Sequence, residues 1–181
     1  MKDFELVKEC LKGKPDAQRQ FYEFYAPRML GVCYRYASSR DEAEDFLQEA
    51  FIIIFKKLHQ YRAEGELGAW IRRIVVNTAL NCIKAKHRII ESSNIIAIDQ
   101  IPNTSILEDP VSDRELMELV HQLPVGYKTV FNLYAIEGYS HDEIGKMLNI
   151  KASTSRSQYA RAREMLMNKI NPKEKIKNNA K

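Results

Sequence analysis

Hydrophobic residues recur along this chain at the three- and four-residue spacing of amphipathic helices, in two long stretches, residues 1–92 and 112–172. Neither stretch alternates apolar and polar residues as a half-buried strand does. One helix is expected from about Asp41, because its apolar positions fall on a single face: Phe46, Leu47, Ala50, Phe51, Ile54 and Leu58. The pattern therefore predicts an all-α fold.

The segment between the two helical stretches has a different composition. Residues 93–111 contain two prolines and several Ser, Asn and Thr, and they lack a helical stripe. We interpret them as a flexible linker between two small helical domains, 1–92 and 112–172, followed by a lysine-rich tail, 173–181. Both domains carry more Lys and Arg than Asp and Glu, and such a basic excess is typical of proteins that bind polyanions.

Several classes of function lack support in the sequence. No apolar run is long enough to span a bilayer, and the N-terminus lacks the apolar core of a signal peptide. Cys10, Cys33 and Cys82 lie far apart, which argues against a disulfide framework or a zinc site and favours a reducing cytoplasm. No metal-ligand spacing, phosphate loop or nucleophile motif is present. We therefore expect no metal, no cofactor, no direct membrane insertion and no enzymatic activity.

The sharpest local signal lies near residue 140. Ser140 and Glu143 have the spacing of a capping box, directly before a short apolar pattern that contains Ile144. A break near Asn149 separates this short helix from a second one that begins at about Ser153. A short helix, a tight turn and a second helix form a helix-turn-helix.

On a helical wheel, the second helix has two different faces. The inner face consists of residues that would pack on the first helix: Ser155, Tyr159, Ala162 and Leu166. The outer face combines arginines with small residues, and only Glu164 adds an acid. A major groove accommodates one helix, and arginine binds guanine edges or phosphates with two hydrogen bonds. We therefore interpret this helix as DNA-binding, with the candidate residues Ser153, Thr154, Arg156, Ser157, Ala160 and Arg161.

Two further surfaces are expected in the first domain. The acidic face of the helix from Asp41 carries Asp41, Asp45, Gln48, Glu49 and Ile52. An apolar residue ringed by polar ones suits a protein partner, although plain solvation explains the face equally well. The next long helix carries a basic and amide stripe beneath a glycine-containing loop, a combination that suits single-stranded DNA. Its candidates are Tyr61, Arg62, Arg73, Asn77, Asn81, Lys84 and Arg88, while Trp70 either joins them or belongs to the core.

Three segments, in order, resemble a known family. DEAEDFLQEAFIIIFKKL is similar to the helix by which bacterial RNA polymerase sigma factors of the extracytoplasmic function (ECF) group, within the sigma-70 family, bind core polymerase. GELGAWIRRIVVNTALNCIKAKHR resembles the segment that melts and recognises the −10 element. LPVGYKTVFNLYAIEGYSHDEIGKMLNIKASTSRSQYARAREML resembles the domain that reads the −35 element. The resemblance covers about residues 20–172.

The resemblance implies a role for each candidate surface. Asp45, Gln48, Glu49 and Ile52 would face a coiled coil of the largest polymerase subunit. Asn77 and the loop from Tyr61 to Gly68 would bind the −10 element. Arg156 and its neighbours would bind the major groove of the −35 element. The expected partners are core RNA polymerase, promoter DNA and an anti-sigma factor, which in many members is membrane-bound.

Some positions depart from the family pattern, and two other functions fit parts of the sequence. Lys151 replaces a small N-cap residue, Ser155 replaces an apolar core residue, and Ala160 is smaller than usual. Val75–Val76 is more apolar than the usual pair before Asn77. A free-standing helix-turn-helix regulator would explain only the second domain. A pure protein-interaction module would leave the arginines of the last helix unexplained.

Overall fold

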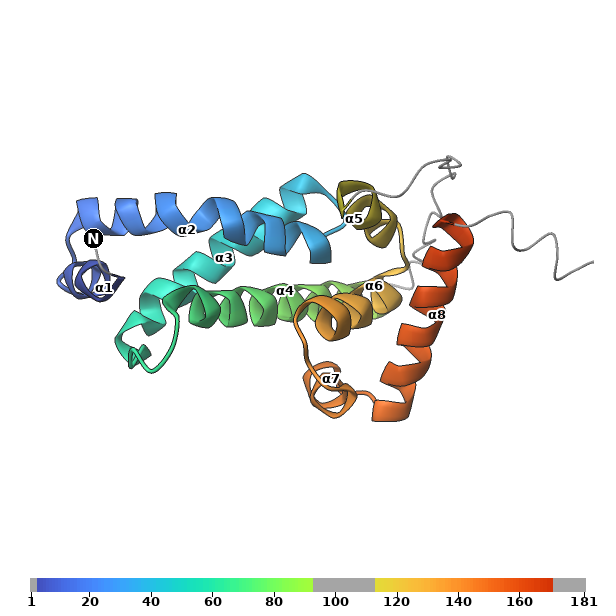
Figure 1. The fold of residues 1–181 in the computed structure, drawn as a ribbon. Helices are drawn as coiled ribbons and strands as arrows, with labels where there is room; N and C mark the ends of the chain where they lie inside the picture. Colours follow the sequence, from blue (N-terminus) through green and yellow to red (C-terminus); the bar gives the residue numbers. More distant parts are fainter. Residues whose placement is uncertain (1–2, 93–112, 171–181) are drawn as a thin grey trace, which may run out of the picture. The chain divides into compact units, whose positions relative to one another are not determined.

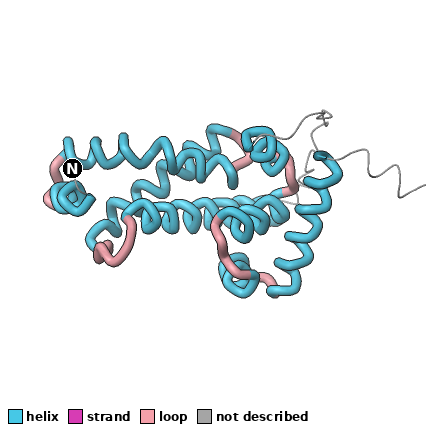
Figure 2. The backbone as a smooth tube through the Cα atoms, in the orientation of Figure 1, coloured by secondary structure: helices cyan, strands magenta, loops and turns pink. Residues whose placement is uncertain are grey.

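The structure is a computed structural model that describes residues 3–92 and 113–170, with side chains described over 3–86 and 115–170. All regular structure within these ranges is helical (Figures 1 and 2), so the all-α prediction is confirmed. The helices belong to two compact units, one on each side of residues 93–112, as the sequence predicted. The predicted linker and the basic tail lie outside the described residues, and the boundaries at 92 and 112 remain predictions.

The described part of the first unit, residues 3–92, contains four α-helices and one 3₁₀ turn. These elements are α1 (Asp3–Leu11), α2 (Pro15–Tyr36), α3 (Arg40–Lys57), η1 (Leu58–Gln60) and α4 (Leu67–Ser92). Figure 1 shows α3 crossing obliquely between α2 and α4, and these three helices contact one another pairwise. The six apolar residues predicted for the inner face of α3 and its C-terminal end are all buried. Aromatic contacts between α2 and α3, such as Phe21–Phe55 at 5.5 Å, complete this core.

Local sequence signals explain where these helices begin and end. Pro15 opens α2 at a position where its missing N–H costs nothing and its fixed φ suits a helix. Ser39 caps α3 by accepting a hydrogen bond from the Glu42 amide at 3.2 Å. Lys56 and Lys57 end α3, where positive charge is favourable against the helix dipole.

The second unit consists of α5 (Asp113–His121), α6 (Val125–Phe131), a π-helical turn η2 (Asn132–Ile136), α7 (His141–Leu148) and α8 (Ala152–Ile170). Helix α8 contacts α5, α6 and α7 and therefore organises the unit. Its core includes Leu119, Val120, Leu123, Ala162 and Leu166.

The predicted helix-turn-helix is present in full. The Ser140 hydroxyl accepts from the Glu143 amide at 3.3 Å, and the Ser140 amide donates to the Glu143 carboxylate at 2.8 Å, so the capping box is confirmed. Asn149 ends α7 in the left-handed conformation, with φ 58°. Helix α8 begins at Ala152, one residue before the expected start, and Lys151 precedes it.

Gly145 allows the turn to lie directly against α7. A Cβ at this position would be 2.8 Å from the carbonyl oxygen of Ile150 and 3.4 Å from the amide of Ala152. Both are backbone atoms, so the turn itself would have to move. The amide of Ile150 also donates to the Gly145 carbonyl at 2.9 Å.

We expect Gly145→Ala to lower the free energy of unfolding by about 1–3 kcal/mol, because it overpacks this contact. Urea unfolding followed by circular dichroism would measure the loss. Gly126→Ala is the matched control, since its Cβ would meet only the Gln158 side chain at 3.8 Å. That control should be neutral or stabilising by up to about 1 kcal/mol. Equal stability of the two variants would contradict the close approach.

Candidate functional site

The acidic face predicted on α3 is exposed. Its five candidates all lie on the surface: Asp41, Asp45, Gln48, Glu49 and Ile52. Ile52 is 49% exposed and lies among the exposed acids and Gln48 of this face. The face therefore has the composition of a protein-binding surface, an apolar centre among acids and amides.

A groove of about 500 Å³ lies between this face and α4. Asp45 and Glu49 line it from α3, and Asn81, Cys82 and Lys86 line it from α4. The predicted basic and amide stripe is thus divided in space, because Asn81 lies beside the acidic residues rather than at the loop. Burial raises the pKa of the Cys82 thiol, and the nearby carboxylates of α3 raise it further.

Glu42 joins α3 to α4 at the edge of this groove. Its carboxylate accepts from the Lys86 ammonium at 2.8 Å and from the Ser38 amide at 2.5 Å. Burial alone would raise the pKa of Glu42, but the hydrogen bonds from Lys86 and Ser38 outweigh burial and leave this pKa lowered.

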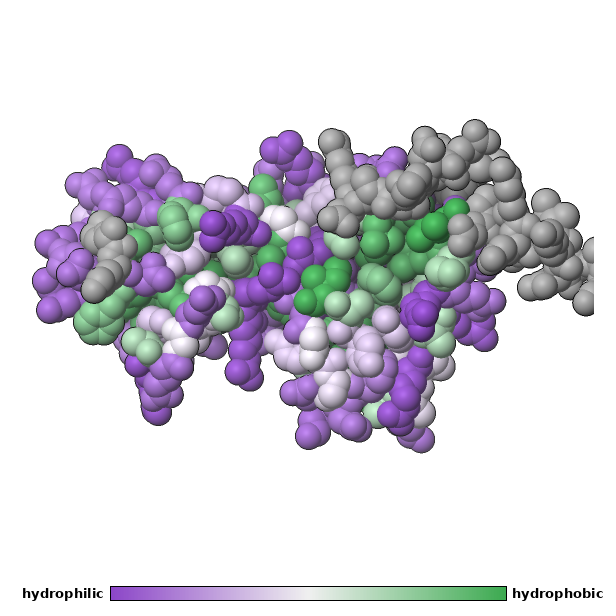
Figure 3. All heavy atoms as spheres, in the orientation of Figure 1, coloured by the Kyte–Doolittle hydropathy of each residue, from purple (hydrophilic) through white to green (hydrophobic). Residues whose placement is uncertain are grey.

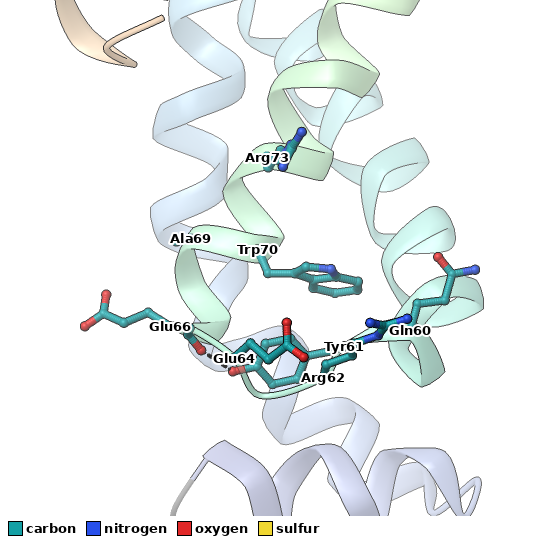
Figure 4. A pocket seen from close by; sticks show the side chains of 9 residues that line it. Gln60, Tyr61, Arg62, Glu64, Glu66, Ala69, Trp70 and Arg73 are labelled. Carbon is teal, nitrogen blue, oxygen red and sulfur yellow. Dashed lines mark hydrogen bonds between the residues drawn. The ribbon is translucent and has the colours of Figure 1, made fainter.

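A second cavity, of about 390 Å³, lies at the start of α4 (Figure 4). Four of the residues predicted to bind single-stranded DNA line it: Tyr61, Arg62, Trp70 and Arg73. In Figure 4 the Trp70 ring lies over the loop that carries Tyr61, Arg62 and Glu64. The Tyr61 and Trp70 ring centroids are 5.7 Å apart with planes at 52°. Two aromatic rings and two guanidinium groups around one cavity can stack a base and hold its phosphates.

The loop under this cavity is held in a defined shape. The Tyr61 hydroxyl donates to the Gly65 carbonyl at 2.6 Å and closes the loop. Ala63 has φ 57°, a conformation uncommon for a residue with a Cβ and often found where function requires it. Leu67, fully buried at the start of α4, anchors the far end of the loop.

The rest of the α4 stripe has mixed exposure. Arg73, Asn77 and Asn81 are exposed and Lys84 is half-buried, whereas the side chain of Arg88 lies outside the described residues. Val76, which departs from the family pattern, is 1% exposed and belongs to the core. Trp70 is half-buried and lines the cavity.

The two faces predicted for α8 are present in the structure. Ser155, Ala162 and Leu166 are buried and Tyr159 is half-buried. The outward candidates Ser153, Arg156, Ser157, Ala160 and Arg161 are exposed, and Thr154 is half-buried. The Ser157 hydroxyl donates to the Thr154 carbonyl at 2.9 Å. In Figure 3 the surface where α7 and the start of α8 lie is coloured mostly hydrophilic to neutral.

Some residues at these sites were not individual candidates, although Glu64 and Glu66 lie in the loop from Tyr61 to Gly68 that the family resemblance connects with the −10 element. Gln60, Glu64 and Glu66 also line the cavity at the loop, and Cys82 and Lys86 line the groove. His141 contacts Ser155, 14 residues further along the chain. These contacts arise from packing between helices, which no motif encodes.

Neither a cluster of metal ligands nor a membrane-spanning helix is present in the described part of the chain. Among the described side chains, those of 3–86 and 115–170, no three His, Cys, Asp or Glu are grouped to hold a metal ion. No described helix is long and apolar enough to cross a membrane.

The two units match two family models. Residues 21–89 match Sigma-70 region 2, and residues 113–166 match Sigma-70, region 4. The ECF RNA polymerase sigma-E factor of Haemophilus influenzae is 31% identical, over 94% of this chain and 96% of that protein. The ECF RNA polymerase sigma factor SigW of Bacillus subtilis is 30% identical, over 91% of this chain and 94% of that protein. This helical, two-unit chain therefore belongs to the ECF group of RNA polymerase sigma factors.

Solved structures share the fold. The sigma factor RpoE of Bartonella quintana, crystallised in complex with the anti-sigma factor NepR, aligns over 82% of this chain and 93% of its own with a TM-score of 0.53 and 18% identity. At 18% sequence identity, this similarity shows that the two proteins share a fold. As a sigma factor, the chain binds core RNA polymerase and directs promoter-specific initiation through −10 and −35 elements.

We expect Glu42→Gln to lower the stability of the first unit by about 0.5–1 kcal/mol at pH 7, because the pairing with Lys86 is lost. The lowered pKa means that the carboxylate stabilises the folded chain above its unfolded pKa, roughly 4.3. The difference from wild type should therefore shrink as the pH falls below that value.

Urea unfolding at several pH values, followed by the fluorescence of Trp70, the single tryptophan, measures this difference. Glu44→Gln is the control, because its pair with Arg40, at 3.0 Å, is exposed. If the free energy of unfolding of Glu42→Gln stays below that of wild type by the same amount at every pH, the ion pair is ruled out as the cause.

Proposed function

We propose that the two units divide promoter recognition through three surfaces: the acidic face of α3 for core polymerase, the cavity at the start of α4 for the melted −10 strand, and the outer face of α8 for −35 duplex DNA. The observation that carries this division is charge segregation. Acids and Ile52 gather on the exposed face of α3, whereas the exposed face of α8 carries arginines. Surfaces of opposite charge select different partners.

The start of α8 suits a major groove. Its outward residues are small apart from the arginines, so the backbone can approach the bases closely. Arg156 and Arg161 lie on either side of the exposed arc, and each can bind a guanine edge or a phosphate with two hydrogen bonds.

Arg156→Ala should relax base discrimination at one −35 position by about 5- to 100-fold, the effect of losing one bidentate contact. Holoenzyme assembled with the variant would transcribe a pool of promoter fragments randomised over the −35 positions, and the transcripts would be sequenced. The control Lys146→Ala removes an exposed cation from α7 and should weaken all sequences alike. Unchanged discrimination with Arg156→Ala would exclude this arginine from base reading.

The cavity at the start of α4 suits an unstacked base. Its volume, about 390 Å³, can accept a ring system, and Tyr61 and Trp70 offer faces on which that ring can stack. Arg62 and Arg73 at the rim can bind the neighbouring phosphates. The closed, strained loop presents these groups in a preformed arrangement.

Trp70→Ala should weaken binding of holoenzyme to a single-stranded −10 oligonucleotide by about tenfold or more, because one stacking surface is lost. Trp70→Phe keeps a flat ring and should retain most of the affinity. Fluorescence anisotropy of a labelled oligonucleotide at fixed salt measures both. Equal affinity of the Ala variant and wild type would contradict the stacking role of Trp70.

The acidic face should bind a basic, partly apolar surface of core polymerase. Asp45 and Glu49 lie one turn apart, with Ile52 beside them. Because all three side chains are exposed while the other face of α3 is buried, substitutions here change the surface and leave the core intact.

Reversing both charges, Asp45→Lys with Glu49→Lys, should reduce affinity for core polymerase by more than tenfold, since like charges then face each other. The matched control, Asp16→Lys with Glu23→Lys, changes the net charge equally on the exposed surface of α2. Affinity would be measured with purified core enzyme at stated salt. A folded double variant that still binds core polymerase normally would show that this face serves another purpose.

The remaining parts of the proposal follow from the family. We propose that the chain acts in the cytoplasm, has no catalytic activity of its own, and is controlled by an anti-sigma factor. The complex of the Bartonella quintana relative with NepR supports the last point. A free-standing regulator is not favoured, because it would leave the region 2 unit without a role.

A further inference from the structure

The recognition helix α8 is joined to α7 by a hydrogen bond near its start. Nδ1 of His141, the first residue of α7, lies 2.9 Å from the hydroxyl oxygen of Ser155. Ser155 is 0% exposed, so its hydroxyl cannot bond to water and requires a protein partner. An apolar residue in place of Ser155 could not make this bond.

The His141 ring is held from a second side by aromatic contacts. It stacks on Tyr134 of the π-helical turn η2, with centroids 4.2 Å apart and planes at 8°. Tyr134 in turn lies 4.6 Å from the ring of Tyr159, one helical turn after Ser155 on α8. The imidazole is therefore fixed between η2 and α8 while its nitrogen holds Ser155.

Ser155 has a special place in α8. Among residues 152–158, which form the first two turns of the helix, it alone is buried. The next buried residues, Ala162 and Leu166, lie further along. Gly145 lies directly against the turn, and within the first two turns of α8 the buried Ser155 makes a hydrogen bond to α7.

Rotation of α8 matters because Arg156, which follows Ser155, faces outward and Thr154, which precedes it, is half-buried. Successive residues of a helix are 100° apart, so turning the helix about Ser155 moves both side chains relative to the groove. Base recognition requires side chains to be held within roughly 0.5 Å and 10–20° of their productive positions.

We propose that His141 is a positioning residue for −35 recognition: its hydrogen bond to Ser155, braced by the stack on Tyr134, sets the rotation of α8 and hence the register in which Arg156 meets the bases. This inference rests on the proposed reading of the −35 element by α8. His141 acts through Ser155, without contacting DNA.

The test compares holoenzymes carrying His141→Phe, Ser155→Ala, both changes, or His141→Asn, on promoter fragments randomised over the −35 positions. His141→Phe keeps an aromatic ring for the stack but loses the nitrogen. Asn carries a polar atom near the position of Nδ1 and keeps the bond to Ser155. The readout is the ratio of transcription from the best −35 sequence to transcription from its single-base variants.

We expect His141→Phe and Ser155→Ala each to lower this ratio by about tenfold, because either change removes the hydrogen bond that holds the rotation of α8. The double variant should be no worse than the poorer single variant, because the two residues act as one unit. His141→Asn should recover at least part of the ratio. Transcription from a template already melted at −10 and lacking a −35 element should stay within twofold of wild type, a result that a general folding defect would not give.

Arg156→Ala separates failure of this inference from failure of the proposed function. If Arg156→Ala relaxes discrimination and the His141 and Ser155 variants do not, the positioning role is overturned and the reading by α8 stands. If Arg156→Ala also has no effect on discrimination, the proposal that α8 recognises the −35 bases is wrong. If the double variant loses discrimination by the sum of the two single losses, in free-energy terms, His141 and Ser155 do not act as one unit and the proposal is overturned. Thermal unfolding accompanies each variant, and should His141→Phe not fold, Ser155→Ala and His141→Asn decide the question.

Discussion

Burial of one face of α3 between α2 and α4 determines the first unit. Residues such as Phe46, Ala50 and Ile54 are at most 5% exposed, and each large side chain removed from water contributes about 2 kcal/mol to stability. Because this face is inside, the acids and Ile52 must point outward. The same packing sets the line along which α4 lies, and so determines which of its residues border the acidic groove and which border the loop.

In the second unit too, burial of one helix face determines which residues point outward, around a smaller core. Helix α8 buries Ala162 and Leu166 against α5 and α6, which leaves its arginines outside. At its start the apolar contact gives way to a polar one, the bond between Ser155 and His141. A hydrogen bond is directional, whereas apolar packing is not, so a polar contact at this point can specify a rotation that two small apolar residues would leave free.

Much of this arrangement could be predicted from the sequence, because it depends on residues close in the chain. The capping box at Ser140 and the outward face of α8 follow from spacing alone. Which side chains meet between helices could be predicted only in part. Asn81 belongs to the groove because α3 packs beside it, and Trp70 is half-buried because the loop folds back beneath its ring. His141 carried no motif, since its partner is 14 residues away and its stacking depends on a π-helical turn.

The division of promoter recognition among three surfaces is the central claim, and site-specific photo-crosslinking tests it most directly. A photoreactive residue would replace Ile52, Ala69 or Ala160 in turn, in holoenzyme bound to a promoter melted around −10. All three positions are exposed, one on each surface. We expect crosslinks from position 52 to the largest polymerase subunit, from position 69 to the single strand near −10, and from position 160 to duplex DNA near −35. Crosslinks from 52 to DNA, or from 160 to polymerase alone, would contradict this division.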